Sequence, residues 1–198
     1  MHRQIACRRS SGSDSILEIG AGTLNHLPYE GHWKRYDIVE PFRELYQDSD
    51  QRQRVRTIYS DIREVPEQNR YDRVLSVAVL EHLTNLPEVV ARSALLLTPT
   101  GTFQAGIPSE GGFLWGAAWR CTTGVSYRVR TGLSYGDLMR HEHVNDAAEI
   151  LAVLRHFFST VTVRRFPLPF HHLSFYACAE AAGARADFCA AFLRGNRQ

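Results

Sequence analysis

Short apolar runs, most of them closed by a glycine, a proline or a charged residue, recur along the first half of the chain. Five of them have the length and composition of buried strands: Ser15–Ile19, Arg35–Val39, residues 55–60, residues 71–79 and Gly101–Pro108. A short continuous apolar run bounded by turn residues is typical of a strand that is buried on both faces. We therefore predict five strands between residues 15 and 108.

The segment between the fourth and fifth predicted strands has helical periodicity. Pro87 suits the first turn of a helix, and Pro99 and Gly101 are residues that end one. The apolar residues between them recur at helical spacing: Val89, Val90, Ala94 and Leu97. We predict a helix between these two strands.

The last third of the chain predicts one more helix and two more strands. Residues 144–158 place Asp146 in the first turn of a helix, with an apolar face made of Ile150, Leu151, Leu154 and Phe158. Residues 160–166 and 172–179 then have strand composition, and prolines divide them. A hairpin is the arrangement that this pattern favours.

Strands that alternate with helices predict an α/β fold, a Rossmann-like doubly wound sheet that is mostly parallel, with an antiparallel strand at its C-terminal edge. We expect a single domain over residues 1–198, with its core in residues 15–108 and 145–180. Residues 109–144 are aromatic, glycine-rich and without a clear period, and they are too long for a plain connector. We predict that they form a cap or lid over the C-terminal edge of the sheet, where doubly wound folds bind ligands.

Composition narrows the class of protein. The chain has 198 residues, 44% hydrophobic and 22% charged, which is ordinary for a soluble globular protein. The formal net charge of +2 is small and does not indicate the concentrated basic surface of a nucleic-acid-binding protein, so we expect no nucleic-acid partner. No apolar stretch approaches the ~18 residues that span a bilayer, and the N-terminal segment lacks the apolar centre of a signal peptide. These features predict a cytoplasmic protein without a membrane span.

The first predicted strand runs directly into a glycine turn with the sequence "EIGAG". A phosphate-gripping loop would need a lysine that is absent from this turn. A nicotinamide or flavin site would prefer a third glycine where the chain has Asn25. A third group of cofactor sites has an acid just before the glycines, and Glu18 stands there.

Four motifs, in order and at the right spacing, resemble those of class I S-adenosylmethionine-dependent methyltransferases. The stretch "LEIGAG" resembles the first motif, "DIVEP" the second and "YSDIREVP" the third. The fourth, "YDRVLSVAVLEHL", is similar to the branch that acts on small molecules, and "LLLTPTGTF" matches the turn before the fifth strand. The resemblance covers residues 15–108 and implies S-adenosyl-L-methionine as cofactor and S-adenosyl-L-homocysteine as product.

The resemblance also implies roles for individual residues. Glu40 would hold the ribose hydroxyls, Asp61 the adenine amine, and Ile62 would lie against the ring. The glycine pair lets the backbone approach the methionine part, and Glu18 suits the cationic sulfonium. The full expected cofactor set is Glu18, Gly20, Ala21, Gly22, Glu40, Pro41, Asp61, Ile62, Ser76 and Val77. An alternative for Asp61 is a helix N-cap.

The chain departs from the family pattern after the glycine turn. Leu24 occupies the third glycine position, and only residues 23–34, which include Pro28 and Gly31, separate the turn from the second strand. We therefore expect the first helix to be short or replaced by a loop.

Candidate bases cluster at the end of the predicted cap: His141, Glu142 and His143. Methyl transfer is an in-line displacement that mainly needs alignment, with a base when the acceptor carries a proton. The same three residues could instead fix the cap onto the last helix, and the sequence leaves both roles open. The His-x-His spacing also suits a metal, but no metal site is predicted. Four aromatic residues could line an acceptor pocket or form the core of the cap: Trp115, Trp119, Tyr127 and Tyr135.

The function that these features predict is S-adenosylmethionine-dependent methyl transfer to a small-molecule acceptor. O- or C-methylation is favoured over N-methylation, because "SVAV" at residues 76–79 replaces the "NPPY"-like stretch of amino-methylating nucleic-acid enzymes. One alternative is a catalytically silent methyltransferase-like binding module, which the shortened first helix keeps open. The other is an NAD(P)-dependent oxidoreductase, which Asn25 disfavours.

Overall fold

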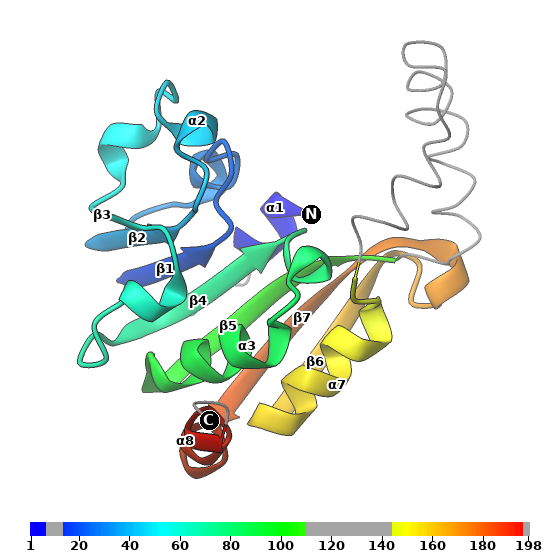
Figure 1. Ribbon diagram of the computed structural model, residues 1–198. Coiled ribbons are helices and arrows are strands. Elements are labelled where there is room, and N and C mark those ends of the chain that lie inside the picture. Colours follow the sequence, from blue (N-terminus) through cyan, green and yellow to red (C-terminus); the bar gives the residue numbers. More distant parts are fainter. Residues whose placement is uncertain (7–13, 110–143, 196–198) are drawn as a thin grey trace.

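A seven-stranded sheet forms the centre of the protein (Figure 1). The computed structural model describes residues 1–6, 14–109 and 144–195. The strand order is β3-β2-β1-β4-β5-β7-β6. The strands are β1 (Ser15–Ile19), β2 (Arg35–Val39), β3 (Thr57–Tyr59), β4 (Tyr71–Val77), β5 (Leu97–Pro108), β6 (Phe158–Pro167) and β7 (Ser174–Ala184). The predicted Rossmann-like α/β sheet is confirmed.

Strand directions place the ends of most strands at one edge. β1, β2, β3, β4 and β5 pair in parallel, whereas β7 is antiparallel to both of its neighbours, β5 and β6. Because β7 is reversed, β6 runs in the same direction as β5. The carboxyl ends of β1, β2, β4, β5 and β6 therefore lie at the same edge of the sheet. The predicted antiparallel addition at the C-terminal side is confirmed, with β7 as the reversed strand.

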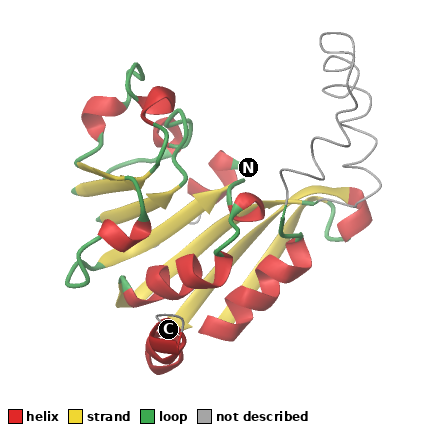
Figure 2. Cartoon of the chain, in the orientation of Figure 1, coloured by secondary structure: helices red, strands yellow, loops and turns green. Residues whose placement is uncertain are grey.

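Helices and short turns connect the strands. The α-helices within the described residues are α1 (His2–Ala6), α2 (Arg43–Tyr46), α3 (Leu86–Leu95), α7 (Ala147–Phe157) and α8 (Ala186–Gly195). The 3-10 turns there are η1 (Leu27–Tyr29), η2 (Arg52–Arg54), η3 (Ile62–Glu64), η4 (Leu80–His82) and η5 (His171–Leu173). Figure 2 shows α3, α7 and α8 along one side of the sheet. None of the helices in the described ranges is long and apolar enough to cross a membrane.

The larger apolar core lies between the sheet and helices α3, α7 and α8. Alternate strand residues point to this face, among them Leu17 of β1 and Phe103 of β5, and both are fully buried. They pack with Val90 of α3 and Leu154 of α7. Asp146 caps α7 by accepting hydrogen bonds from two backbone N–H groups, so the predicted start of this helix is confirmed.

The opposite face of the sheet is covered by α1 and by the loop that follows β1. Ile16 and Leu75 point to this face, where they pack with Ile5 of α1 and with Leu24 and Leu27 of the loop. In this loop the single turn η1 stands where related folds have their first helix. The expectation of a short or replaced helix is confirmed.

A buried polar network ties this loop to the sheet. Arg73 of β4, which has no exposed surface, donates two hydrogen bonds of 2.9 Å to Glu30, and His26 Nε2 lies 2.8 Å from the same carboxylate. Arg73 Nε also donates to Gln104 of β5. Burial acts to raise the pKa of Glu30, but the contacts with His26 and Arg73 outweigh it and lower the pKa to about 2. The ion pair between Glu30 of the loop and Arg73 of the sheet thus holds the loop in place.

Several element boundaries differ from the prediction. Leu97 belongs to β5 rather than to the preceding helix, because it pairs with Tyr71 across the sheet. Phe158 begins β6 instead of lying on a helix face, and Phe157 is the buried residue that ends α7. Helix α8 was not predicted. Of the proposed cap, only its two end residues lie inside the described part of the chain.

Candidate cofactor site

The turn after β1 has the backbone conformation that glycine favours. Gly20 and Gly22 have φ angles of +69° and +51°. A Cβ built on Gly20 would lie 2.4 and 2.5 Å from the two γ-carbons of Val79, whereas one on Gly22 meets nothing within 4 Å. Leu24 at the third glycine position also has a positive φ, +64°. The backbone of the turn therefore keeps the left-handed conformation at position 24, although the residue there is leucine.

Glu40 connects this turn to the residues that follow β2. One carboxylate oxygen accepts a 2.8 Å hydrogen bond from the N–H of Gly22, and the other accepts a 3.0 Å bond from the N–H of Phe42. The side chain is almost wholly buried. Each carboxylate oxygen has a second lone pair, so Glu40 can still accept from a ligand hydroxyl.

A cavity of about 480 Å³ opens at the carboxyl ends of β1, β2 and β4, and we call it the sheet-edge pocket. Six residues of the expected cofactor set line it: Gly20, Gly22, Glu40, Pro41, Asp61 and Ile62. Ten further residues complete the lining: Ile19, Val39, Phe42, Leu45, Ser60, Val79, His82, Leu83, Asn85 and Val89. Its volume lies in the range of about 300–1,000 Å³ that small-molecule and cofactor sites occupy.

Phe42 and Leu45 were not predicted as site residues, although they line the sheet-edge pocket. They are 63% and 43% exposed, which is unusual for large apolar side chains. Phe42 immediately precedes the short helix α2, and Leu45 lies on it. An apolar ring bound in the pocket would cover both side chains. In the sequence, the only indication of these two residues is the stretch "PFREL" directly after Glu40.

Four expected cofactor residues lie outside the pocket lining: Glu18, Ala21, Ser76 and Val77. Glu18 is buried and accepts a 2.7 Å hydrogen bond from the hydroxyl of Tyr36. Burial raises the pKa of Glu18 to about 8, despite this hydrogen bond. A carboxyl group that holds its proton near neutral pH contributes little charge to a neighbouring sulfonium. Ser76 is also fully buried, and its hydroxyl has no partner among the described residues.

The pocket residues contributed by the fourth motif come after the strand rather than from its last positions. Ala78 has a φ of +56°, which ends β4 and turns the chain toward the pocket. Val79, His82 and Leu83 line the pocket in consequence. The second half of the "LEHL" stretch, His82 and Leu83, is therefore part of the pocket wall.

Asp61 has two roles in the structure. It caps η3, because its side chain accepts a 2.8 Å hydrogen bond from the N–H of Arg63, as the N-cap alternative predicted. It also lines the sheet-edge pocket. Its side chain is 43% exposed, so an oxygen is left for a ligand amine.

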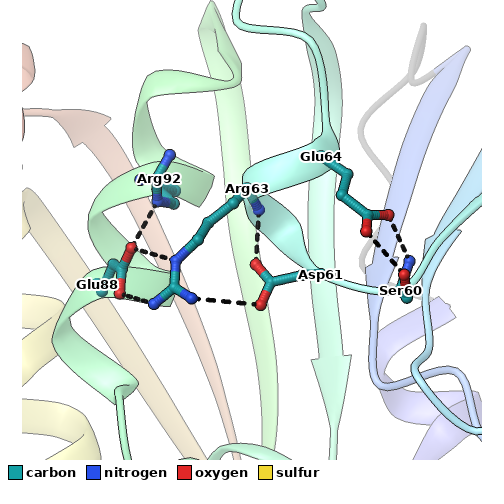
Figure 3. Close-up of polar contacts among 6 residues, drawn as sticks. All are labelled: Ser60, Asp61, Arg63, Glu64, Glu88 and Arg92. Atoms are coloured by element: carbon teal, nitrogen blue, oxygen red, sulfur yellow. Dashed lines mark hydrogen bonds and ion pairs between the residues drawn. The ribbon is translucent and has the colours of Figure 1, made fainter.

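Figure 3 shows how Asp61 is held. Arg63 lies between Asp61, 3.7 Å away, and Glu88 of α3, to which its Nε donates a 2.8 Å hydrogen bond. Arg92, one turn further along α3, donates to the same carboxylate. The hydrogen bond from Arg63 lowers the pKa of Glu88 to about 2. This row of alternating charges fixes η3 against α3.

Glu81 is a buried carboxyl group beside the pocket wall. It is 2% exposed, and one of its oxygens has no partner among the described residues. Burial raises the pKa of Glu81 to about 7. Its backbone carbonyl accepts from the N–H groups of Val144 and Asn145, so η4 is fastened to the point where the chain returns from the proposed cap.

This raised pKa predicts a pH-dependent stability. The folded state keeps the Glu81 proton up to about pH 7, whereas the unfolded state releases it near pH 4.5. The stability that Glu81 contributes is therefore fully present below pH 4.5 and is lost as the pH rises to about 7. Over this pH range we expect the titration of Glu81 to lower the free energy of unfolding by ~3 kcal/mol.

Urea unfolding at pH 5 and pH 8, on the wild type and on Glu81→Gln, measures this contribution. The variant should lose ~2.5 kcal/mol less between the two pH values than the wild type, because part of the effect already falls below pH 5. The comparison cancels any constant cost of placing a buried amide there. Equal losses in the two proteins would show that Glu81 does not titrate differently on folding.

The three candidate bases, His141, Glu142 and His143, lie outside the described residues. The same holds for the four aromatic residues of the proposed cap. Within the described residues no group of three or more histidine, cysteine, aspartate or glutamate side chains is placed to hold a metal ion.

Comparison with known sequences identifies the region that carries the four motifs. Residues 17–105 match the model of a family described as a methyltransferase domain. This stretch contains the glycine turn, Glu40, Asp61 and the "LEHL" motif. No curated protein matches the chain in sequence.

Comparison with solved structures extends the likeness to most of the fold. A S-adenosylmethionine-dependent methyltransferase from Thermotoga maritima, a possible histamine N-methyltransferase, superposes with a TM-score of 0.64 and 15% identity, covering 91% of this chain and 86% of that one. The N-methyltransferase NodS from Bradyrhizobium japonicum, in complex with S-adenosyl-L-homocysteine, gives a TM-score of 0.60 at 19% identity, with coverage of 91% and 83%. The CurJ carbon methyltransferase gives a TM-score of 0.61 at 20% identity; the match covers 93% of this chain but 54% of that one.

Proposed function

We infer that this chain, a class I S-adenosylmethionine-dependent methyltransferase, transfers the methyl group to a small-molecule acceptor. The observation that carries the proposal is the geometry of Glu40. A buried carboxylate lies at the base of a pocket of cofactor size, held between the glycine turn and the residues after β2. This arrangement suits recognition of a ribose diol, because a charged acceptor binds hydroxyl donors strongly.

The residues of the sheet-edge pocket fit the parts of the cofactor. We propose that Gly20 and Gly22 face its methionine part, where the absence of a Cβ lets the backbone approach. Glu40 accepts from the ribose hydroxyls. The half-exposed carboxylate of Asp61 accepts from the adenine amine, and Ile62 and Phe42 enclose the ring.

The bound cofactor supplies an electrophilic methyl group on a cationic sulfur. The chain's own contribution is to align the acceptor in line with that methyl and to exclude water. We propose His141, Glu142 and His143 as the groups that remove a proton from the acceptor when it carries one. O- or C-methylation remains the proposed outcome; the similar proteins include both an N- and a C-methyltransferase.

Calorimetric titration of the purified full chain with S-adenosyl-L-homocysteine tests the cofactor assignment, with NAD as the control ligand. We expect micromolar binding of S-adenosyl-L-homocysteine and none of NAD, because the pocket offers a ribose acceptor but no pyrophosphate-binding third glycine. Absence of binding would favour a silent binding module. Binding of NAD alone would favour an oxidoreductase.

A further inference from the structure

The connection between β6 and β7, together with the first residues of β7, exposes four large apolar side chains within eight positions. Leu168, Phe170, Leu173 and Phe175 are 46%, 66%, 40% and 40% exposed. We call residues 167–175 the apolar tip; in Figure 1 they form the orange connection at the end of the sheet. Exposed apolar side chains are normal when scattered, but a contiguous group marks a binding surface.

The surroundings of the apolar tip are basic. No aspartate or glutamate occurs from Phe158 to Ala179, whereas Arg164 and Arg165 lie on β6 just before the tip. Two histidines, His171 and His172, lie within it. An apolar group flanked by cations and free of acids is complementary to an anionic lipid surface.

Prolines and local hydrogen bonds remove some of the backbone N–H donors of the apolar tip. Two of its residues are prolines, Pro167 and Pro169, which have no N–H. The N–H of Leu173 donates to the carbonyl of Phe170, and the Ser174 hydroxyl donates to the carbonyl of His171. A segment with two prolines is poorly suited to pairing with a strand of another protein.

The apolar tip lies at the same edge of the sheet as the sheet-edge pocket. β6 is parallel to β1, β2 and β4, so its carboxyl end, where the tip begins, is at the edge where those strands end. Ser109, at the end of β5, holds the base of the tip through a hydrogen bond from its N–H to the carbonyl of Phe175. Whatever surface the tip contacts therefore faces the pocket edge.

We propose that the apolar tip is a membrane-surface anchor. Its four exposed apolar side chains enter the boundary between headgroups and acyl chains of an anionic bilayer, and Arg164 and Arg165 contact the lipid phosphates. The pocket edge then faces the bilayer. Together with the proposed function, on which this last step rests, the geometry points to an apolar acceptor that dissolves in the membrane.

Co-sedimentation with vesicles tests the anchor on the full chain. We expect binding to phosphatidylcholine–phosphatidylglycerol vesicles, weaker binding to phosphatidylcholine alone, and a decrease with added salt. Phe170→Ser should lower the vesicle partition coefficient about tenfold or more, because its phenyl ring is the most exposed of the tip. Arg164→Gln should lower it about fivefold on the anionic vesicles only.

Phe188→Ser is the matched control, because Phe188 is 57% exposed but lies on α8, away from the tip. It should bind vesicles as the wild type does. Equal losses in Phe170→Ser and Phe188→Ser, or no vesicle binding by the wild type, would overturn the proposal. A concentration-dependent dimer that Phe170→Ser abolishes, without vesicle binding, would assign the tip to a second copy instead. Titration with S-adenosyl-L-homocysteine reports separately on the proposed function.

Discussion

Glu40→Ala is expected to weaken binding of S-adenosyl-L-homocysteine by more than tenfold. Two hydrogen bonds from the ribose to a charged acceptor would be lost, each worth about 1.5–3 kcal/mol. The variant also removes the acceptor for the N–H groups of Gly22 and Phe42, so the pocket loses part of its base. Calorimetric titration of the two proteins under identical conditions measures the change.

A matched control separates this effect from a general change in charge. Glu44 is exposed on α2, four residues away and outside the pocket lining, so Glu44→Ala should leave the affinity unchanged. The affinity of Glu40→Gln should lie between those of Glu40→Ala and Glu44→Ala, because an amide keeps one acceptor oxygen but cannot accept from both backbone N–H groups. Wild-type affinity in a folded Glu40→Ala protein would remove Glu40 from the cofactor site.

Gly20→Ala should lower the free energy of unfolding by ~2–4 kcal/mol. The left-handed backbone conformation costs a residue with a Cβ about 1–2 kcal/mol, and the new methyl group would overlap the side chain of Val79. Val79 is β-branched and has little freedom to move aside. Urea unfolding of the variant and the wild type gives the difference.

The two parts of this cost can be told apart. Gly22→Ala has a similar backbone cost but no overlap, so it should destabilise by only ~1–2 kcal/mol. In the double variant Gly20→Ala/Val79→Ala, the overlap with the γ-carbons is gone and only the 3.0 Å approach to the Cβ remains, so the cost of the alanine at position 20 should fall toward the backbone part. If Gly20→Ala were no worse than Gly22→Ala, the close packing of the turn against Val79 would not hold in solution.

The succession of strands and helices could be anticipated because the apolar runs are short, separated by turn residues and alternate with helical periods. Boundaries were less predictable where pairing between distant residues decides them. Leu97 fits the helical period of the preceding segment, yet it pairs with Tyr71 and belongs to β5. Helix α8 was missed although its apolar residues, among them the buried Cys189 and Leu193, stand at helical spacing.

The candidate site was predictable where a motif fixes the backbone conformation. It was less predictable where the position of a side chain depends on contacts with residues distant in the sequence. Gly20, Gly22 and Glu40 line the pocket as expected, because turn geometry places them there. The direction of Glu18 depends on Tyr36 of the next strand, which no local pattern reveals. Phe42 and Leu45 were missed because a sequence does not show that an apolar residue remains exposed.

The pair formed by Arg73 and Glu30 has a consequence for how this protein can change over generations. Both side chains are buried, and each would leave an uncompensated charge if the other were replaced, at a cost of about 3–5 kcal/mol. Related proteins can therefore lose both charges or keep both, but a variant with only one of them is close to unfolding. We expect substitutions at positions 30 and 73 to occur together, and the length of the loop that carries Glu30 to be constrained as long as the pair is kept.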